Sequence, residues 1–159
     1  MDTKAKVKTK DLTLEDMQVG QTFRSADYAV DAEQIKSFAS QFDPQPFHLD
    51  EEQASKTFFG ELVASGWHTA AITMRLLVSS APVLGGLIGA GGEISWPRPT
   101  RPGDTLHVES EVVEIKPSKS RPDRGTVTIR SITRDQAGNA VQVLTAKLVV
   151  PRCNPDTNQ

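Results

Sequence analysis

The chain has 159 residues, a length that corresponds to one domain with a single hydrophobic core. Hydrophobic residues make up 37% of it and charged residues 24%, which excludes a disordered or fibrous protein. The formal net charge of −2 gives no electrostatic reason to expect nucleic acid or an anionic membrane as a partner.

Cysteine usage and the two chain ends predict the compartment. Cys153 is the only cysteine, so an internal disulfide and a cysteine zinc cluster are excluded. The N-terminus has no apolar leader region, and no apolar run approaches the roughly 18 residues that a membrane span needs. We therefore expect a cytoplasmic protein with a flexible N-terminal segment at 1–11, one domain at 12–151 and a polar C-terminal tail at 152–159.

The first third of the chain predicts a strand followed by a helix. Residues 21–30 alternate imperfectly and predict the strand. Residues 31–42, DAEQIKSFASQF, place apolar side chains at i, i+3, i+4 and i+7, which is the spacing of a helix. Asp31 is suited to cap its start, and Pro44 predicts its end because proline disfavours the helical conformation of the residue before it.

The segment QFDPQPFHLDEE, residues 41–52, then interrupts the helical pattern. Two prolines predict a stiff, non-helical turn over 43–48, and a short helix is expected to begin at Asp50. Residues 67–80 follow with apolar side chains on nearly every side of a predicted helix. We expect this to be the central helix, buried over most of its surface.

Beyond Pro82 the pattern changes to that of a sheet. The glycine-rich GGLIGAGG lacks the residues of a phosphate-binding loop or a dinucleotide fingerprint, so we expect a flexible connection into the next strand. Period-two alternation predicts three long strands, with a basic loop after the first and a hairpin turn, DQAGN, after the second. The order of elements predicts an α+β fold in which the central helix covers one face of an antiparallel sheet. The three predicted strands are 105–115, 126–130 and 144–150.

Asp43 and His48 are the first candidates for catalysis. Pro44 and Pro46 restrict the backbone between them, so a carboxylate and an imidazole are held on one stiff turn. Such a pair can share one water, with one group accepting its proton and the other donating a proton elsewhere in the reacting molecule. The alternative is structural, because an Asp before Pro is commonly a turn or cap residue.

Ser65 and Gly66 are the second candidates, because they stand just before the predicted central helix. Ser65 is suited to cap the helix, and Gly66 lets a ligand approach the backbone closely. N–H groups at such a terminus can bind an anionic oxygen, such as the oxyanion of a thioester reaction. An ordinary cap with a glycine packed against the sheet is the alternative.

The third candidate is the basic loop KPSKSRPDRG, which contains Lys116, Lys119, Arg121 and Arg124. It suits a ligand with several phosphates, such as coenzyme A, although such clusters are more often solvated faces. Arg98 and Arg101 share this ambiguity. Metal binding is not expected, because the three histidines lack metal-ligand spacing, and His107 is expected to be solvated.

Four stretches together resemble the MaoC-like dehydratase family, which includes (R)-specific enoyl-CoA hydratases. The resemblance runs in order over about residues 12 to 151, through FDPQPFHLDEE, FGELVASGWHTAAITMRLL, ISWPRPTRPGDTL and the basic loop. It implies a hotdog fold, in which a curved antiparallel sheet wraps one long central helix. It also implies a homodimer or higher homo-oligomer joined through sheet edges.

The resemblance further implies reversible hydration of a trans-2-enoyl-CoA. Asp43 and His48 match the pair that activates the water, and Gly66 matches the glycine whose N–H binds the thioester oxygen. Coenzyme A would enter as part of the substrate, with no other cofactor. The chain departs from the family in SGW, where the hydratases usually have His-Gly-Met, and in PQP, where they have Asn-Pro. A hotdog acyl-CoA thioesterase and a non-catalytic acyl-CoA-binding protein remain alternatives, since a fold does not fix a function.

Overall fold

The computed structural model describes residues 10–153. Helices precede the long strands, as the sequence predicts. The elements, in chain order, are a 3-10 helix η1 (Leu14–Asp16), β1 (Thr22–Arg24), β2 (Tyr28–Ala29), α1 (Ala32–Phe42), α2 (Pro46–Leu49), α3 (Glu51–Ser55), α4 (Gly66–Ser80), β3 (Ile88–Ser95), β4 (Thr105–Pro117), β5 (Arg124–Arg134) and β6 (Ala140–Pro151).

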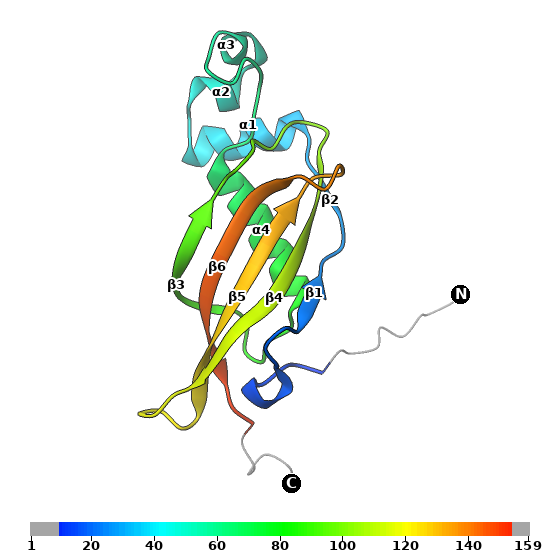
Figure 1. The fold of residues 1–159 in the computed structure, drawn as a ribbon. Coiled ribbons are helices and arrows are strands. Elements are labelled where there is room, and N and C mark those ends of the chain that lie inside the picture. The colour runs from blue at the N-terminus through cyan, green and yellow to red at the C-terminus, as the bar shows by residue number, and fades with distance from the viewer. Residues whose placement is uncertain (1–9, 154–159) are drawn as a thin grey trace, which may run out of the picture.

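The strands form one antiparallel sheet of order β1-β4-β5-β6-β3, with β2 also paired to β4. Figure 1 shows this sheet twisting in front of α4, which crosses one face, while α1, α2 and α3 gather at one end. The expected α+β class, a curved antiparallel sheet wrapped around one long central helix, is therefore confirmed.

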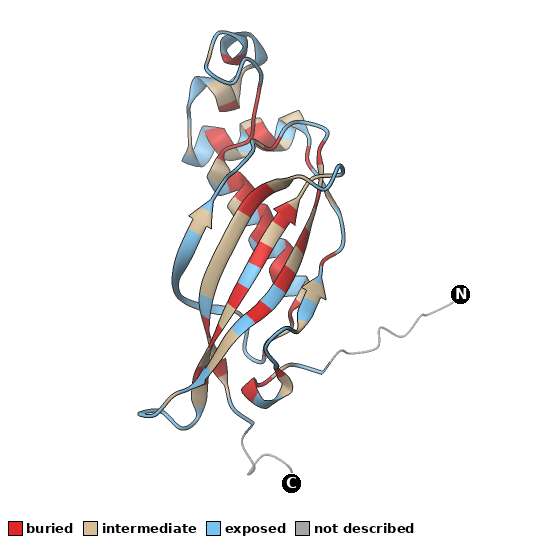
Figure 2. Ribbon diagram, in the orientation of Figure 1, coloured by how far each residue is buried: buried red, intermediate tan, exposed pale blue. Residues whose placement is uncertain are grey.

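The core lies between α4 and the inward face of the sheet (Figure 2). Leu106 and Val108 alternate with half-buried neighbours along β4 and pack with the face of α4 that carries Ile72 and Leu76. Burying each such side chain contributes roughly 1.5–3 kcal/mol, so this face of the helix fixes it on the sheet.

One expectation about α4 is wrong, because the helix is not buried over most of its surface. Trp67 is 60% exposed, Met74 45% and Val78 57% in the single chain. Residues 67, 74 and 78 lie on one side of a helix of 3.6 residues per turn. The apolar residues on nearly every side of α4 therefore divide into a core face and an exposed apolar face.

The glycine-rich segment is also not the expected connection, because it forms most of edge strand β3, paired to β6. A bulge between Gly89 and Gly91 accompanies the left-handed φ of +127° at Gly91. Gly92 lies so close to the Thr145 carbonyl that a Cβ would collide with it. Glycine is thus required here for close strand approach, which is a known reason for glycine within a strand.

The remaining strand predictions are mostly confirmed. The three predicted strands are present and longer than expected, and residues 135–139 form the hairpin turn between β5 and β6. The strand expected over 21–30 is instead divided into β1 and β2.

The chain ends are partly described. Residues 1–9 and 154–159, parts of the expected flexible segment and polar tail, lie outside the described residues. The first two residues of the tail are held by Glu15. The Arg152 Nε donates to its carboxylate at 2.7 Å, and the Cys153 N–H donates to the same carboxylate at 2.8 Å. No helix in the described part of the chain is long and apolar enough to span a membrane.

Candidate active site

Asp43 is positioned by the end of α1. The helix begins as predicted, because Asp31 Oδ1 accepts a hydrogen bond from the Gln34 N–H at 2.8 Å. It ends at Asp43, whose φ of −153° and ψ of 68° are not helical and whose N–H still donates to the Ala39 carbonyl at 2.9 Å. The break before Pro44 therefore places the Asp43 carboxylate at the helix end.

His48 lies on a short helical turn that the sequence reasoning excluded. Residues 43–48 were expected to be non-helical, but Pro46–Leu49 form α2. Proline is tolerated in the first turn of a helix because its missing N–H would have no intrahelical acceptor there. Pro46 therefore starts this turn rather than preventing it, and the turn directs His48 back toward Asp43.

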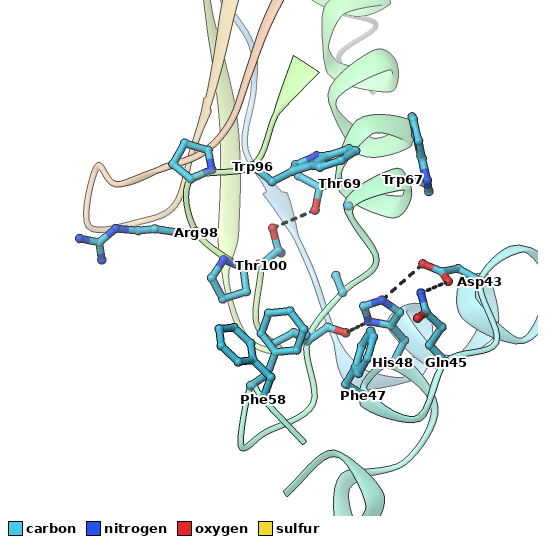
Figure 3. Close-up of a pocket in the computed structure, with 16 residues that line it drawn as sticks. Asp43, Gln45, Phe47, His48, Phe58, Trp67, Thr69, Trp96, Arg98 and Thr100 are labelled. Atoms are coloured by element: carbon cyan, nitrogen blue, oxygen red, sulfur yellow. Dashed lines mark hydrogen bonds and ion pairs between the residues drawn. The ribbon is translucent and has the colours of Figure 1, made fainter. Parts of the chain in front are cut away.

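The two side chains form the polar centre of the site, which Figure 3 shows. His48 Nε2 lies 3.3 Å from Asp43 Oδ2, and the side chains are only 6% and 17% exposed. His48 Nδ1 lies 2.6 Å from the Val63 carbonyl oxygen. Because a carbonyl only accepts, Nδ1 carries the hydrogen, and in the neutral ring Nε2 is left with a lone pair facing the carboxylate.

Two further side chains hold the Asp43 carboxylate. Ser65 Oγ donates to Oδ2 at 2.7 Å, and Gln45 Nε2 donates to Oδ1 at 2.6 Å. Burial alone raises the pKa of Asp43, but these hydrogen bonds, together with the positive charge of His48 when its ring is protonated, outweigh it, so the net pKa is lowered from its ordinary value. The site therefore keeps Asp43 ionised as a proton acceptor.

Ser65 caps α4 as predicted, since its Oγ accepts from the Trp67 N–H at 3.2 Å. Gly66 is the first residue of the helix, where an N–H has no acceptor within the helix. It lines the same cavity as Asp43 and His48, so the structure brings these predicted residues together.

Three contacts of this site were missed from the sequence, namely those from Ser65 and Gln45 to Asp43 and from His48 to the Val63 carbonyl. The polar side chains of Ser65 in SGW and Gln45 in PQP could be identified from the sequence. Their hydrogen-bond partners could not, because each contact depends on how separate elements meet.

The cavity itself measures about 470 Å³ and is bounded mainly by apolar rings. A polar strip interrupts this wall, where Thr69 Oγ1 and Thr100 Oγ1 lie 2.9 Å apart. The pocket therefore combines a small polar centre with apolar walls, as small-molecule sites commonly do. Its aromatic members are Phe47, Phe58, Phe59, Trp67 and Trp96.

The basic loop is not brought to this pocket within the chain. It joins β4 to β5 at the end of the sheet opposite α1 and α2 (Figure 1), and none of Lys119, Arg121 and Arg124 is among the described residues that line the cavity. Arg124 instead pairs with Asp123 at 2.8 Å, and Lys116 pairs with Glu114 at 2.8 Å. The long β4 and β5 strands are the reason, since they carry the loop away from the helices.

The two other arginines differ from each other. Arg101 pairs with Glu61 outside the cavity. Arg98 lines the cavity and makes no ion pair within residues 10–153. Arg98 is therefore the cation available to a ligand at this pocket.

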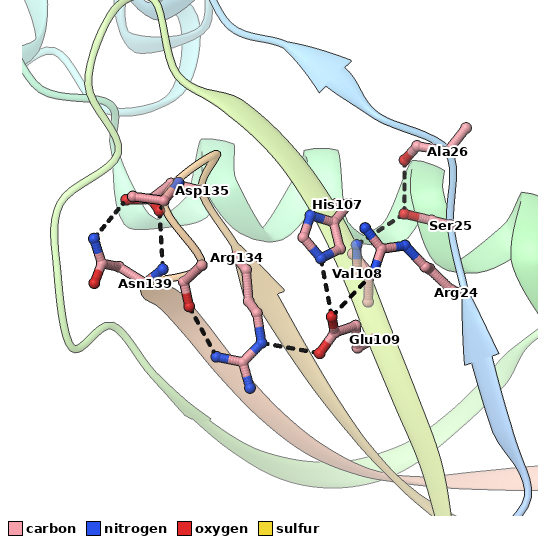
Figure 4. Close-up of polar contacts among 11 residues, drawn as sticks. Arg24, Ser25, Ala26, His107, Val108, Glu109, Arg134, Asp135 and Asn139 are labelled. Atoms are coloured by element: carbon pink, nitrogen blue, oxygen red, sulfur yellow. Dashed lines mark hydrogen bonds and ion pairs between the residues drawn. The ribbon is translucent and has the colours of Figure 1, made fainter.

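The remaining histidines lie outside the reactive centre. His107 is not solvated as expected, because its side chain is only 12% exposed and its Nε2 contacts Glu109 at 3.1 Å. Figure 4 shows that Arg24 and Arg134 also reach Glu109, so His107 belongs to a surface charge cluster. His68 stacks on Phe38, and burial, with a smaller effect of His48, lowers its pKa. Residues 10–153 contain no group of three His, Cys, Asp or Glu side chains arranged to hold a metal ion.

Comparison with known proteins places this geometry in a family. The MaoC-like domain model matches residues 15–135. A crystal structure of a MaoC-like dehydratase from Rhodospirillum rubrum is 62% identical, with a TM-score of 0.88 over 90% of this chain and 99% of that one.

Among the other similar proteins are a hydratase and a dehydratase. The R-hydratase PhaJ1 of Pseudomonas aeruginosa is 28% identical, with a TM-score of 0.73 over 90% of this chain and 88% of that one. The 3-hydroxybutyryl-CoA dehydratase of Methylorubrum extorquens is 31% identical over 111 residues, which cover 69% of each chain. With the family model matching most of its length, the chain belongs to the MaoC-like dehydratase family and has its hotdog fold.

Proposed function

We propose that this MaoC-like protein is a hydro-lyase that reversibly hydrates a trans-2-enoyl-CoA to a 3-hydroxyacyl-CoA. The observation that carries the proposal is the 3.3 Å approach of His48 Nε2 to Asp43 Oδ2 inside the cavity that Gly66 also lines. The names of the similar R-hydratase and 3-hydroxybutyryl-CoA dehydratase support the same reaction class.

In the hydration direction, one water lies beside the Asp43 carboxylate and His48 Nε2 and hydrogen-bonds to both. The pair removes one proton from the water while the water oxygen bonds to C3 of the substrate. The electron pair of the C2–C3 double bond moves toward the thioester oxygen, where the Gly66 N–H stabilises the developing negative charge. A proton then returns from the pair to C2, so one water is added and both groups regain their starting states.

The Val63 carbonyl and Ser65 act as positioning groups in this scheme. The carbonyl holds His48 Nδ1–H, which keeps the reactive Nε2 directed at the water. Ser65 holds the carboxylate from the side of the helix terminus. Ser65 thus contacts Asp43 of the acid–base pair and directly precedes Gly66, the oxyanion donor. This connection fixes the distance between the pair and the donor.

The proposal is tested by following the loss of the ultraviolet absorbance of crotonyl-CoA and longer enoyl-CoAs. We expect Asp43→Asn and His48→Gln each to lower the rate by about 10²–10⁴-fold, because each removes a general acid–base group. Asp123→Asn and His107→Gln are matched controls outside the cavity and should retain the wild-type rate. Unchanged rates in both pocket variants, with folding verified by circular dichroism, contradict the proposal.

A colorimetric assay for free thiol and a binding measurement separate the alternatives. Release of free thiol from acyl-CoA without hydration would identify a thioesterase. Tight acyl-CoA binding without either reaction would identify a non-catalytic binding protein.

We also propose that the protein is a homodimer or higher homo-oligomer. Two features support this association: the open edge of β3 and the exposed apolar face formed by Trp67, Met74 and Val78 on α4. Edge strands and exposed apolar patches both favour pairing with another chain.

A further inference from the structure

A row of aromatic rings runs along one wall of the cavity, from solvent to His48. The ring centroids of Phe58 and Phe59 lie 5.4 Å apart, and the Phe47 ring follows 5.2 Å from that of Phe59. The His48 ring lies 4.5 Å beyond Phe47. Exposure falls along the row, because Phe58 is 97% exposed, Phe59 37% and His48 5%. All four rings line the cavity, so the row marks its outer end at Phe58 and its inner end at His48.

Arg98 belongs to the outer end of the same cavity. Figure 3 shows Phe58 and Arg98 on the side of the pocket away from Asp43, with the Arg98 guanidinium extending outward. Arg98 is exposed and makes no ion pair within residues 10–153. Apart from His48, the charged side chains that line the cavity in the described part of the chain are Asp43 and Arg98. The cavity therefore has a carboxylate at its inner end and an unpaired cation at its outer end.

The backbone that carries Arg98 is held firmly. Pro97 has a fixed φ, and Pro99 disfavours the helical conformation at Arg98, so the main chain on both sides is restricted. The segment is then anchored at Thr100, whose carbonyl accepts from the Ala64 N–H at 2.8 Å and whose Oγ1 lies 2.9 Å from that of Thr69. The guanidinium is thus presented to solvent from a stiff segment fixed to the wall of the cavity.

This charge arrangement orients a ligand that is anionic at one end only. A phosphate near Asp43 would be repelled by the carboxylate, whereas a phosphate at the outer end would be attracted by Arg98. Arginine suits that role because its planar guanidinium can donate two parallel hydrogen bonds to a phosphate. Coenzyme A thioesters have the matching shape, with an uncharged acyl end, an uncharged pantetheine arm and phosphates at the far end.

We propose that Arg98 is a substrate-binding residue that pairs with a phosphate of coenzyme A at the mouth of the pocket and so directs the acyl end toward Asp43 and His48. This inference rests on the proposed function for the class of ligand, an acyl-CoA thioester. It assigns the phosphate contact to Arg98 rather than to the basic loop, which lies at the other end of the sheet.

The direct test compares the binding of butyryl-CoA with that of butyryl-pantetheine, which has the same thioester but no phosphate, by isothermal titration calorimetry. We expect the wild-type protein to bind butyryl-CoA more tightly. Arg98→Gln should weaken butyryl-CoA binding by about two- to tenfold, because an exposed ion pair is partly screened by solvent. It should leave butyryl-pantetheine binding unchanged. An unchanged affinity for butyryl-CoA, or an equal loss for both ligands, overturns the inference.

Two further measurements separate charge from shape. Raising the ionic strength from about 0.1 M to 1 M shortens the Debye length from about 10 Å to 3 Å, so the effect of Arg98→Gln on butyryl-CoA binding should shrink. Arg98→Lys keeps the positive charge and should restore part of the lost affinity. An effect of Arg98→Gln that is independent of salt and is not reduced in Arg98→Lys contradicts an ion pair with phosphate.

Two control variants test other cations of the chain. Arg101→Gln removes a nearby arginine that pairs with Glu61 outside the cavity, and it should keep the wild-type preference for butyryl-CoA over butyryl-pantetheine. The double variant Lys119→Gln/Arg121→Gln, in the basic loop, should keep it as well. Loss of the preference in the loop variant, with the preference retained in Arg98→Gln, would assign the phosphate to the loop and overturn the inference.

Saturated butyryl thioesters cannot be hydrated, so this test is independent of turnover. The predicted affinities without any hydration of crotonyl-CoA would leave the inference intact and remove the proposed function. Hydration of crotonyl-CoA with unchanged butyryl-CoA binding in Arg98→Gln would do the reverse. A wild-type protein that binds butyryl-pantetheine as tightly as butyryl-CoA, or binds neither, would overturn the inference.

Discussion

The carboxylate of Asp43 accepts hydrogen bonds from Ser65 and Gln45 and lies beside His48. Burial by itself favours the neutral acid, and the hydrogen bonds reverse that preference, so the pKa of Asp43 is lowered. A carboxyl group with a lowered pKa stays ionised to a lower pH than it would at its ordinary pKa. At the residue scale, the site thus maintains a proton acceptor across neutral and moderately acidic pH.

Ser65→Ala tests this account of Asp43. Removing the hydroxyl removes a hydrogen bond that favours the carboxylate, so the pKa of Asp43 should rise. The acid limb of the kcat/KM profile should therefore move to higher pH, as measured by hydration rates across pH. Loss of the helix cap should also lower the free energy of unfolding by about 0.5–2 kcal/mol.

Ser65→Thr retains a hydroxyl and serves as the control. It should keep the acid limb close to that of the wild-type protein. An acid limb that stays in place in Ser65→Ala contradicts the assigned role of the Ser65 hydrogen bond.

At the scale of elements, the one-turn helix α2 determines where His48 points. Pro44 ends α1 and Pro46 opens α2, so the backbone reverses within a few residues and returns His48 to Asp43. Proline restricts φ in the unfolded chain as well, which lowers the entropy lost on folding. The two prolines therefore stabilise the fold and hold the imidazole in place together.

Pro46→Ala should lower the free energy of unfolding by about 0.4–1 kcal/mol, because the unfolded chain regains conformational freedom. It should also lower kcat/KM severalfold, since His48 is held less firmly. Chemical denaturation and hydration rates measure the two effects. Pro117→Ala, at the end of β4 away from the cavity, is the control that should leave kcat/KM unchanged. Equal kcat/KM in both variants would contradict the role given to α2.

Much of this arrangement could be predicted from the sequence, and the exceptions have physical causes. The caps of α1 and α4 were predictable because Asp31 and Ser65 act on N–H groups two or three residues away. The turn α2 was not, because four residues are too few to show periodicity, and a proline can either end a helix or begin one. The hydrogen bond from the Trp96 indole N–H to Gln142 Oε1 was not either, since 46 residues separate the two side chains in the sequence.

At the scale of the whole molecule, the exposed apolar face of α4 and the open edge of β3 favour a second copy. The double variant Met74→Lys/Val78→Lys introduces two charges on this face and should shift the protein toward monomers, measured by light scattering after size-exclusion chromatography. Val19→Lys is the control, because Val19 is 65% exposed in the turn before β1 and is not part of that face. A wild-type monomer, or a double variant that remains a dimer, contradicts the proposed interface.

The central claim is that Asp43 and His48 act as one unit on one water. A double-mutant cycle on enoyl-CoA hydration tests it most directly, with Asp43→Asn, His48→Gln and the double variant compared by kcat. Groups that act as a unit are strongly non-additive, so the double variant should be about as slow as either single variant. Rate losses that multiply in the double variant, as expected for independent groups, would contradict the claim.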